Sequence, residues 1–159
     1  MPFTGLVAVP WWLRRLAHEA TTPDSWGAWQ WAGLWFILNG MGLTGWCVYL
    51  FNVVGQGTPL PTDPPKRFVV DGPYRVVRNP MVLGLLSIVI GEAVLFQSRV
   101  VAIYGVCLFV GVQLFVRYWE EPDLARRFGE AYWAYQRHVP RWIPRLPQRS
   151  KPSKSVSSQ

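Results

Sequence analysis

The chain is poor in charged residues, cysteine and histidine, and each shortage narrows what the protein can be. Only 16% of its 159 residues are charged, against about a quarter in a typical soluble domain. Cys47 and Cys107 lie in separate apolar blocks without a CxxC pair, which argues against a disulfide framework. His18 and His138 lie far apart, with no HxxH motif or carboxylate cluster between them, so the sequence predicts no metal site.

Hydrophobic residues make up 50% of the chain and lie in long blocks. Trp29 to Val54 is nearly uncharged and, as a helix of roughly 26 residues, would be about 39 Å long, enough to cross a bilayer with tilt. Met81 to Phe96 and Val100 to Val116 would be about 24 to 26 Å each, and a three-residue turn between them predicts a helical hairpin. Phe3 to Leu13 is too short to cross, so it is an interfacial anchor or the remainder of a longer span. We expect an all-α, multi-pass transmembrane bundle with three spans and a partial or interfacial N-terminal helix.

The distribution of basic residues predicts the orientation of this bundle. The net charge is +7, and most of the Lys and Arg residues fall in the loop from Gly55 to Asn79 or after Val116. The hairpin turn carries Arg99 alone. By the positive-inside rule, the loop and the C-terminal segment face the cytoplasm. Because these cations flank apolar spans, and no zinc-finger, RNP or helix-turn-helix pattern is present, we expect no nucleic-acid binding.

The C-terminal part of the chain has a different pattern. Apolar residues recur at helical spacing from Pro122 to Tyr135, which predicts an amphipathic interfacial helix. Val139 to Pro144 should end this helix and fold back over the same face. Residues 150–159 are rich in Ser and Lys and are expected to form a disordered tail, which leaves residues 1–149 as a single membrane domain.

Three glycines in the first long span spell a dinucleotide-binding pattern. Gly40, Gly42 and Gly45 match GxGxxG, but no strand precedes them and they lie mid-span. Small residues at that depth usually let a neighbouring helix approach closely. We therefore interpret the motif as a helix-packing feature.

Two polar clusters lie at the ends of the predicted hairpin. The first, Asp71 to Gly84, combines turn formers, arginines and a tyrosine just before a span, and the second is Arg117 to Pro122. Pro122 suits the first turn of a new helix and disfavours helical geometry at Glu121, so we expect Glu120 and Glu121 at a bend between two helices. The hairpin would bring both clusters to one membrane surface. The alternative is that the arginines only anchor the chain and the glutamates are solvated.

Glu92 also requires an explanation, because an ionised, unpaired side chain inside a span is costly. The span could end early and let Glu92 reach the far interface, which is the interpretation we favour. Otherwise, Glu92 forms a buried pair with Arg99 or with polar groups of the first span.

The two polar clusters carry a resemblance to a known family. GPYRVVRNPMVLG, at residues 72–84, resembles the GPYRxxRHPxYxG block of the isoprenylcysteine carboxyl methyltransferase and phospholipid methyltransferase group. Glu120 and Glu121, with the residues that follow, resemble its EExxLxxxFGxxYxxYxxxVP block; the matching residues are Leu124, Phe128, Gly129, Tyr132, Tyr135, Val139 and Pro140. The resemblance covers roughly Thr58 to Pro144, and two blocks in order are more specific than one.

The resemblance implies a methyltransferase that uses S-adenosylmethionine (SAM). The residues it places around the cofactor are Tyr74, Arg78, Asn79, Pro80, Gly84, Glu120 and Glu121, and the catalytic group it implies is Arg117, Glu120 and Glu121. Asn79 and Val82 depart from the usual His and Tyr, so one hydrogen bond and one aromatic contact to the cofactor would differ. The implied acceptor is lipophilic, such as a prenylcysteine carboxylate or a phospholipid amine, and no obligate protein partner is expected.

Two other functions are compatible with parts of this pattern. Membrane sterol or enone reductases resemble the group in their C-terminal helices and bind NADPH, but they are generally longer than this chain. A non-enzymatic membrane scaffold would use both clusters as anchors only.

Overall fold

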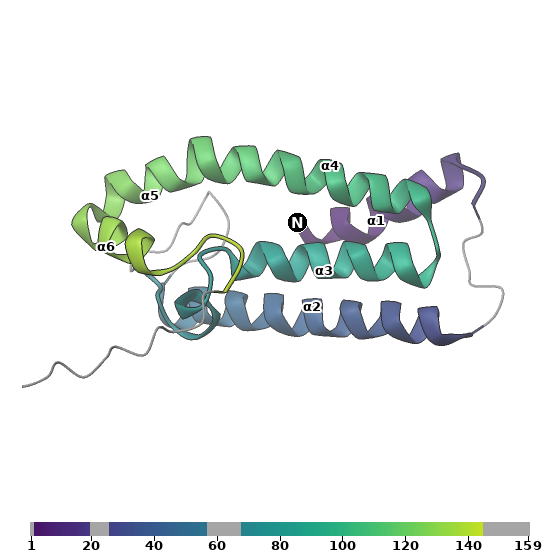
Figure 1. The fold of residues 1–159 in the computed structure, drawn as a ribbon, viewed down its shortest axis with the longest axis horizontal. Helices are drawn as coiled ribbons and strands as arrows, with labels where there is room; N and C mark the ends of the chain where they lie inside the picture. The colour runs from purple at the N-terminus through teal and green to yellow at the C-terminus, as the bar shows by residue number, and fades with distance from the viewer. Residues whose placement is uncertain (1, 20–25, 57–67, 145–159) are drawn as a thin grey trace, which may run out of the picture.

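The computed structural model describes residues 2–19, 26–56 and 68–144. Within these ranges all regular structure is helical, as the sequence predicts (Figure 1). The predicted tail at 150–159 and residues 57–67 of the loop after Gly55 lie outside the described residues. The elements in chain order are α1 (Pro2–Leu16), α2 (Ala28–Val53), the 3₁₀ turn η1 (Gly72–Arg75), α3 (Pro80–Leu95), α4 (Arg99–Phe115), the π-helical turn η2 (Val116–Glu120), α5 (Glu121–Phe128) and α6 (Glu130–His138).

Two of the described helices are long and apolar enough to cross a membrane. They are α2, with 26 residues, and the continuous 30-residue helix Arg99–Phe128 that α4, η2 and α5 form together. The expectation of three such spans is corrected, because α3 has only 16 residues and would extend about 24 Å, less than the hydrocarbon core of roughly 30 Å. Large apolar side chains such as Trp35, Met41 and Ile103 are exposed on the outer faces. Such faces suit contact with lipid.

The α2 and α3 helices run side by side along most of their length, joined by a seam of glycines (Figure 1). Gly33 of α2 faces Gly91 of α3, and Gly40 faces Gly84. A Cβ atom at Gly33 would lie 2.6 Å from the backbone nitrogen of Leu95, a distance at which one helix must move away. The seam therefore allows contact between the two backbones, and Ser87 adds a hydrogen bond of 2.8 Å to the carbonyl of Phe36.

The GxGxxG motif belongs to this seam through one of its three members. Gly40 contacts α3, which confirms the helix-packing interpretation at that position. Gly42 and Gly45 face open space, since a Cβ at either position would have no neighbouring atom within 4 Å, and they contribute nothing to the seam. In this motif, therefore, only Gly40 packs against another helix, and the other two glycines face outward.

The α1 helix packs against α3 and α4 at the end of the bundle opposite to α5 and α6 (Figure 1). It brings Arg14, which is only 2% exposed, close enough to Glu92 for the two charges to interact, and Glu92 itself is 8% exposed. The Arg14 guanidinium also lies 3.5 Å from the centre of the Phe96 ring. The favoured placement of Glu92 at the far interface is therefore wrong: the glutamate is buried, because α1 covers this part of α3 and provides a cation.

We predict that the electrostatic interaction of Arg14 with Glu92 and Glu19 stabilises the bundle without affecting the functional end. Arg14→Met should lower the free energy of unfolding by about 1 to 3 kcal/mol, because it removes a buried cation that acts on both carboxyl groups. Adding Glu92→Leu should recover part of that loss. Thermal unfolding in detergent measures both effects, with the exposed Arg15→Met as the matched control. Equal stability of the Arg14 and Arg15 variants would contradict the role of the pair.

The expected bend at the paired glutamates is absent. The chain stays helical from α4 through η2 into α5, and Glu121 has helical dihedral angles of φ −63° and ψ −42°. The π turn explains how Pro122 is accommodated: the amide of Glu121 bonds to the carbonyl of Val116, five residues back. This wider turn relieves the clash that a proline ring makes with the carbonyl four residues before it.

The predicted C-terminal amphipathic helix is divided in two. Gly129 adopts a φ of +53°, which L side chains rarely take, and separates α5 from α6. The segment after α6 folds back as expected, because the indole Nε1 of Trp142 donates a 2.7 Å hydrogen bond to Gln113 of α4. Both short helices thus lie at the same end of the bundle as the loop before α3.

Candidate functional site

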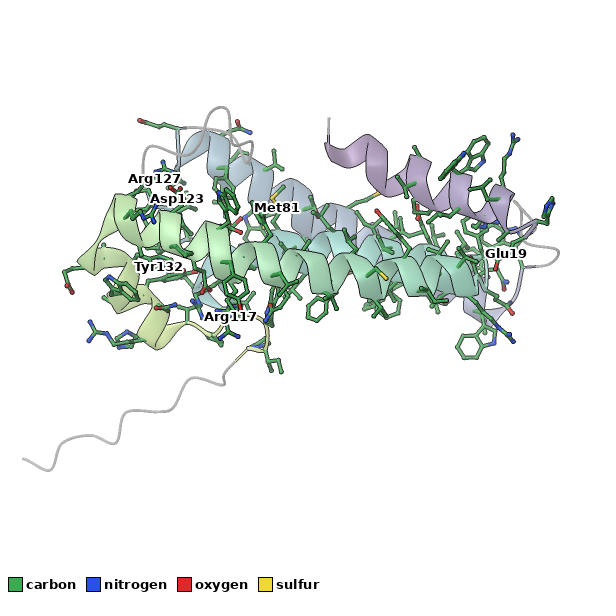
Figure 2. The ribbon with its side chains drawn as sticks, turned by 90° about the horizontal axis from the view of Figure 1, so that it is seen from above. Glu19, Met81, Arg117, Asp123, Arg127 and Tyr132 are labelled. Carbon is green, nitrogen blue, oxygen red and sulfur yellow. The ribbon has the colours of Figure 1, made fainter. Side chains whose placement is uncertain are left out.

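The hairpin of α3 and α4 brings the two polar clusters together at one end of the bundle. Arg78 lies two residues before α3, and Glu121 is the first residue of α5. The Arg78 Nη1 atom donates a 2.7 Å hydrogen bond to Oε1 of Glu121, and the two side chains are only 12% and 10% exposed. Figure 2 shows Tyr132 and Arg117 at this end and Glu19 at the opposite end. The predicted convergence of the two sequence regions is thus present in the structure.

A third charged residue, Arg141, completes the cluster. Its Nε donates to Oε1 of Glu121 at 2.9 Å and its Nη2 donates to Oε2 at 2.6 Å, a forked contact. The backbone supports this arrangement, because the amide of Arg78 donates a 2.8 Å hydrogen bond to the carbonyl of Pro140. Hydrogen bonding to Glu121 raises the pKa of the Arg141 guanidinium. Two guanidiniums around one carboxylate give this cluster a net positive charge.

Two buried donors beside Glu121 lack partners among the described residues. They are Nε of Arg78 and Nδ2 of Asn79, whose side chain is 8% exposed. Buried donors nearly always have an acceptor, so this pair can bind a water molecule or a ligand that offers oxygen atoms. A guanidinium edge with a neighbouring amide is suited to a carboxylate. These residues therefore fit the amino-acid part of SAM.

Glu120 differs from its neighbour Glu121. It lies beyond the last residue of α4, outside the apolar part of the helix, and is partly buried. No ion pair within the described ranges involves it. Its carboxyl group acts electrostatically on Tyr74 and Tyr132. The site thus contains one neutralised carboxylate and one carboxyl group that is open to a ligand or to a proton.

Aromatic rings form one wall of this region. The ring of Phe68 packs at 5.1 Å against both Phe128 and Tyr135 and at 5.9 Å against Tyr132. Burial raises the pKa of Tyr132 and of Tyr135, an effect that the nearby Arg78 opposes in both. The Tyr135 hydroxyl donates a 2.6 Å hydrogen bond to the Tyr74 carbonyl. The wall therefore links the segment before α3 to α5 and α6.

The other residues singled out in the sequence lie around the cluster in different ways. Tyr74 is buried against α2: its ring meets Phe51 edge-on at 5.6 Å, and it shares a buried cluster with Cys47. Burial raises the pKa of the Tyr74 hydroxyl. Pro80 is buried in the first turn of α3, and Gly84 faces α2 in the glycine seam. Arg117 is exposed, with its guanidinium 5.7 Å from the ring of Tyr118.

Arg141 is the member of the cluster that the motifs did not single out. It directly follows Val139 and Pro140, where the chain folds back. The sequence therefore marks it only as a basic residue at that position. Such a residue is indistinguishable in sequence from the many interfacial anchors nearby. The structure distinguishes Arg141 from these anchors, because its guanidinium forms a bidentate contact with the Glu121 carboxylate, which is only 10% exposed.

The fold and the site together define a helical membrane protein with a charge-paired polar site at one end of its apolar helices. The chain belongs to the phospholipid methyltransferase family, whose model matches residues 28–131. This membership, which the resemblance in the two motifs predicted, places the protein among the membrane methyltransferases. No curated protein and no solved structure matches the chain.

Proposed function

We propose that this protein transfers a methyl group from SAM to the amine of a phospholipid at the membrane surface. The observation that carries the proposal is the cluster of Arg78, Glu121 and Arg141, with unpartnered buried donors beside it. The family model covers the first motif and the beginning of the second, with Arg78 and Glu121, and it ends before Arg141. Arg117, which is exposed, would contribute to catalysis only after a rearrangement of its side chain.

The chain's own residues would hold the cofactor through its charged groups. Arg78 and Asn79 would donate to the carboxylate, and Glu120 would accept hydrogen bonds from the amino group or the ribose. The bound cofactor supplies an electrophilic methyl group. The protein would then contribute orientation and exclusion of water, because methyl transfer requires no covalent intermediate with an enzyme side chain.

The charge around Glu120 favours an amine over a carboxylate as the methyl acceptor. A partly buried carboxyl group without a cationic partner in the described part of the chain attracts an ammonium group and repels a prenylcysteine carboxylate. Of its two oxygens, the one that does not hold the cofactor can also accept the proton that an amine must lose. The acceptor would enter from the bilayer along the exposed apolar faces, while the cofactor enters from the aqueous side.

We further propose that the protein spans the membrane several times with this site on the cytoplasmic face. Thirteen of the sixteen Lys and Arg residues lie in the loop between α2 and α3 or after α4. A single cysteine introduced at Arg99, in the turn between α3 and α4, should be labelled only from the opposite side of sealed cells. Labelling from the cytoplasmic side would contradict this orientation.

The proposed function is tested by incubating the purified protein with methyl-labelled SAM and vesicles that contain phosphatidylethanolamine. We expect label in N-methylated phospholipid, and no label in a prenylcysteine peptide offered in the same vesicles. Binding of labelled SAM and of NADPH should be compared on the same preparation. Binding of NADPH alone would favour a membrane reductase, and binding of neither would favour a scaffold.

A further inference from the structure

The hydrogen bonds from Arg141 to Glu121 determine what Arg78 can bind. Arg141 contacts both carboxylate oxygens, through Nε at 2.9 Å and Nη2 at 2.6 Å. Arg78 reaches only Oε1, through Nη1. The Nε of Arg78 therefore stays buried and without a partner in the described structure. One carboxylate is held by two guanidiniums, of which only Arg141 uses its full fork.

Without Arg141, the contacts of Glu121 would change in a predictable direction. A carboxylate that is 10% exposed and has lost one partner must recover its hydrogen bonds from the nearest cation. That cation is Arg78, which already holds Oε1 through Nη1, so its Nη2 would turn to the free Oε2 in an end-on bidentate contact. Arg78 would be drawn towards Glu121, and its Nε edge would move away from the position where it meets a ligand.

We propose that Arg141 is a positioning residue: by holding Glu121, it keeps the Nε edge of Arg78 in place for the carboxylate of the bound cofactor. In this arrangement, Glu121 does not contact the cofactor, and Glu120 is the acidic residue of the pair that does. The inference rests on the proposed function, because it assigns the Arg78 edge to SAM. It also explains why the C-terminal fold-back is attached to the loop before α3 through Pro140 and Arg78.

The test compares two adenosine ligands that differ in the carboxylate. S-adenosylhomocysteine carries the amino-acid group, and 5′-methylthioadenosine lacks it. Arg141→Met should weaken binding of S-adenosylhomocysteine by about tenfold or more, the usual size of a lost charged hydrogen bond. Binding of 5′-methylthioadenosine should change by less than about twofold, because this ligand does not use Arg78. Arg141→Lys, which keeps the charge but has no fork, should lie between wild type and Arg141→Met.

Arg137→Met is the matched control, since Arg137 is an exposed arginine in the last turn of α6. It should leave both affinities at the wild-type value. Equal losses for both ligands in the Arg141 variants would show a merely structural role, and unchanged affinities would show none; either result overturns the inference. Failure of the wild-type protein to bind S-adenosylhomocysteine would contradict the proposed function itself, which distinguishes the two failures.

Discussion

Glu121→Gln is expected to lower kcat/KM for methyl transfer by about 100-fold, because a misplaced Arg78 loses a charged hydrogen bond to the cofactor, worth about 1.5 to 3 kcal/mol. The glutamine keeps the size of the side chain and one acceptor oxygen. It leaves Arg78 and Arg141 facing each other without the carboxylate that neutralises them. The two guanidiniums should then separate, and the cofactor should lose its preformed carboxylate site.

The measurement is a set of initial rates over a range of SAM concentrations in vesicles of fixed composition. Most of the loss should appear in the KM for SAM, because the cluster organises a binding site. Glu130→Gln is the control, since Glu130 is an exposed acid in the first turn of α6. If the Glu121 variant folds and has wild-type rates, the cluster does not bind the cofactor and serves only as a membrane anchor.

Gly33→Leu is expected to disrupt the bundle, with a loss of more than about 3 kcal/mol in the free energy of unfolding. A Cβ at this position would lie 2.6 Å from the Leu95 nitrogen and 2.7 Å from the Gly91 carbonyl oxygen. Both neighbours are backbone atoms, so no side-chain rotation relieves the overlap. The α2 and α3 helices would have to separate along the seam that also contains Gly40 and Gly84.

Gly42→Leu provides the matched control on the same helix. Gly42 is exposed, and nothing lies within 4 Å of a Cβ placed there, so the same substitution should be close to neutral. Thermal unfolding in detergent and gel filtration of both variants measure the difference. A Gly33 variant that is as stable as the Gly42 variant would show that the two helices are not in backbone contact.

The convergence of Arg78 and Glu121 could be predicted from the sequence, because a short hairpin between two apolar helices places their outer ends side by side. The all-α fold followed for the same reason, since long apolar blocks have few alternatives in lipid. The number of membrane spans was harder to predict from the sequence. The block before the hairpin turn is apolar throughout, but its helix begins at Pro80 and ends at Leu95, which makes it shorter than a typical span.

The features that the sequence did not predict depend on contacts between distant residues or on adjustable backbone. The cation beside Glu92 comes from Arg14, in a helix whose role was ambiguous because it is too short to cross a bilayer. Pro122 indicated a bend, yet a π turn accommodates it without one. The forked contact of Arg141 depends on how the last segment folds back, and no local pattern records that.

The central claim is that SAM binds at the end of the bundle where Arg78, Glu121 and Arg141 meet. Ultraviolet cross-linking of methyl-labelled SAM to the purified protein, followed by peptide mapping, tests it most directly. The label should appear on peptides that contain residues 68–84 or 116–142, and excess S-adenosylhomocysteine should abolish it. Label confined to α1 and the first half of α2, at the end occupied by Arg14 and Glu92, would contradict the claim.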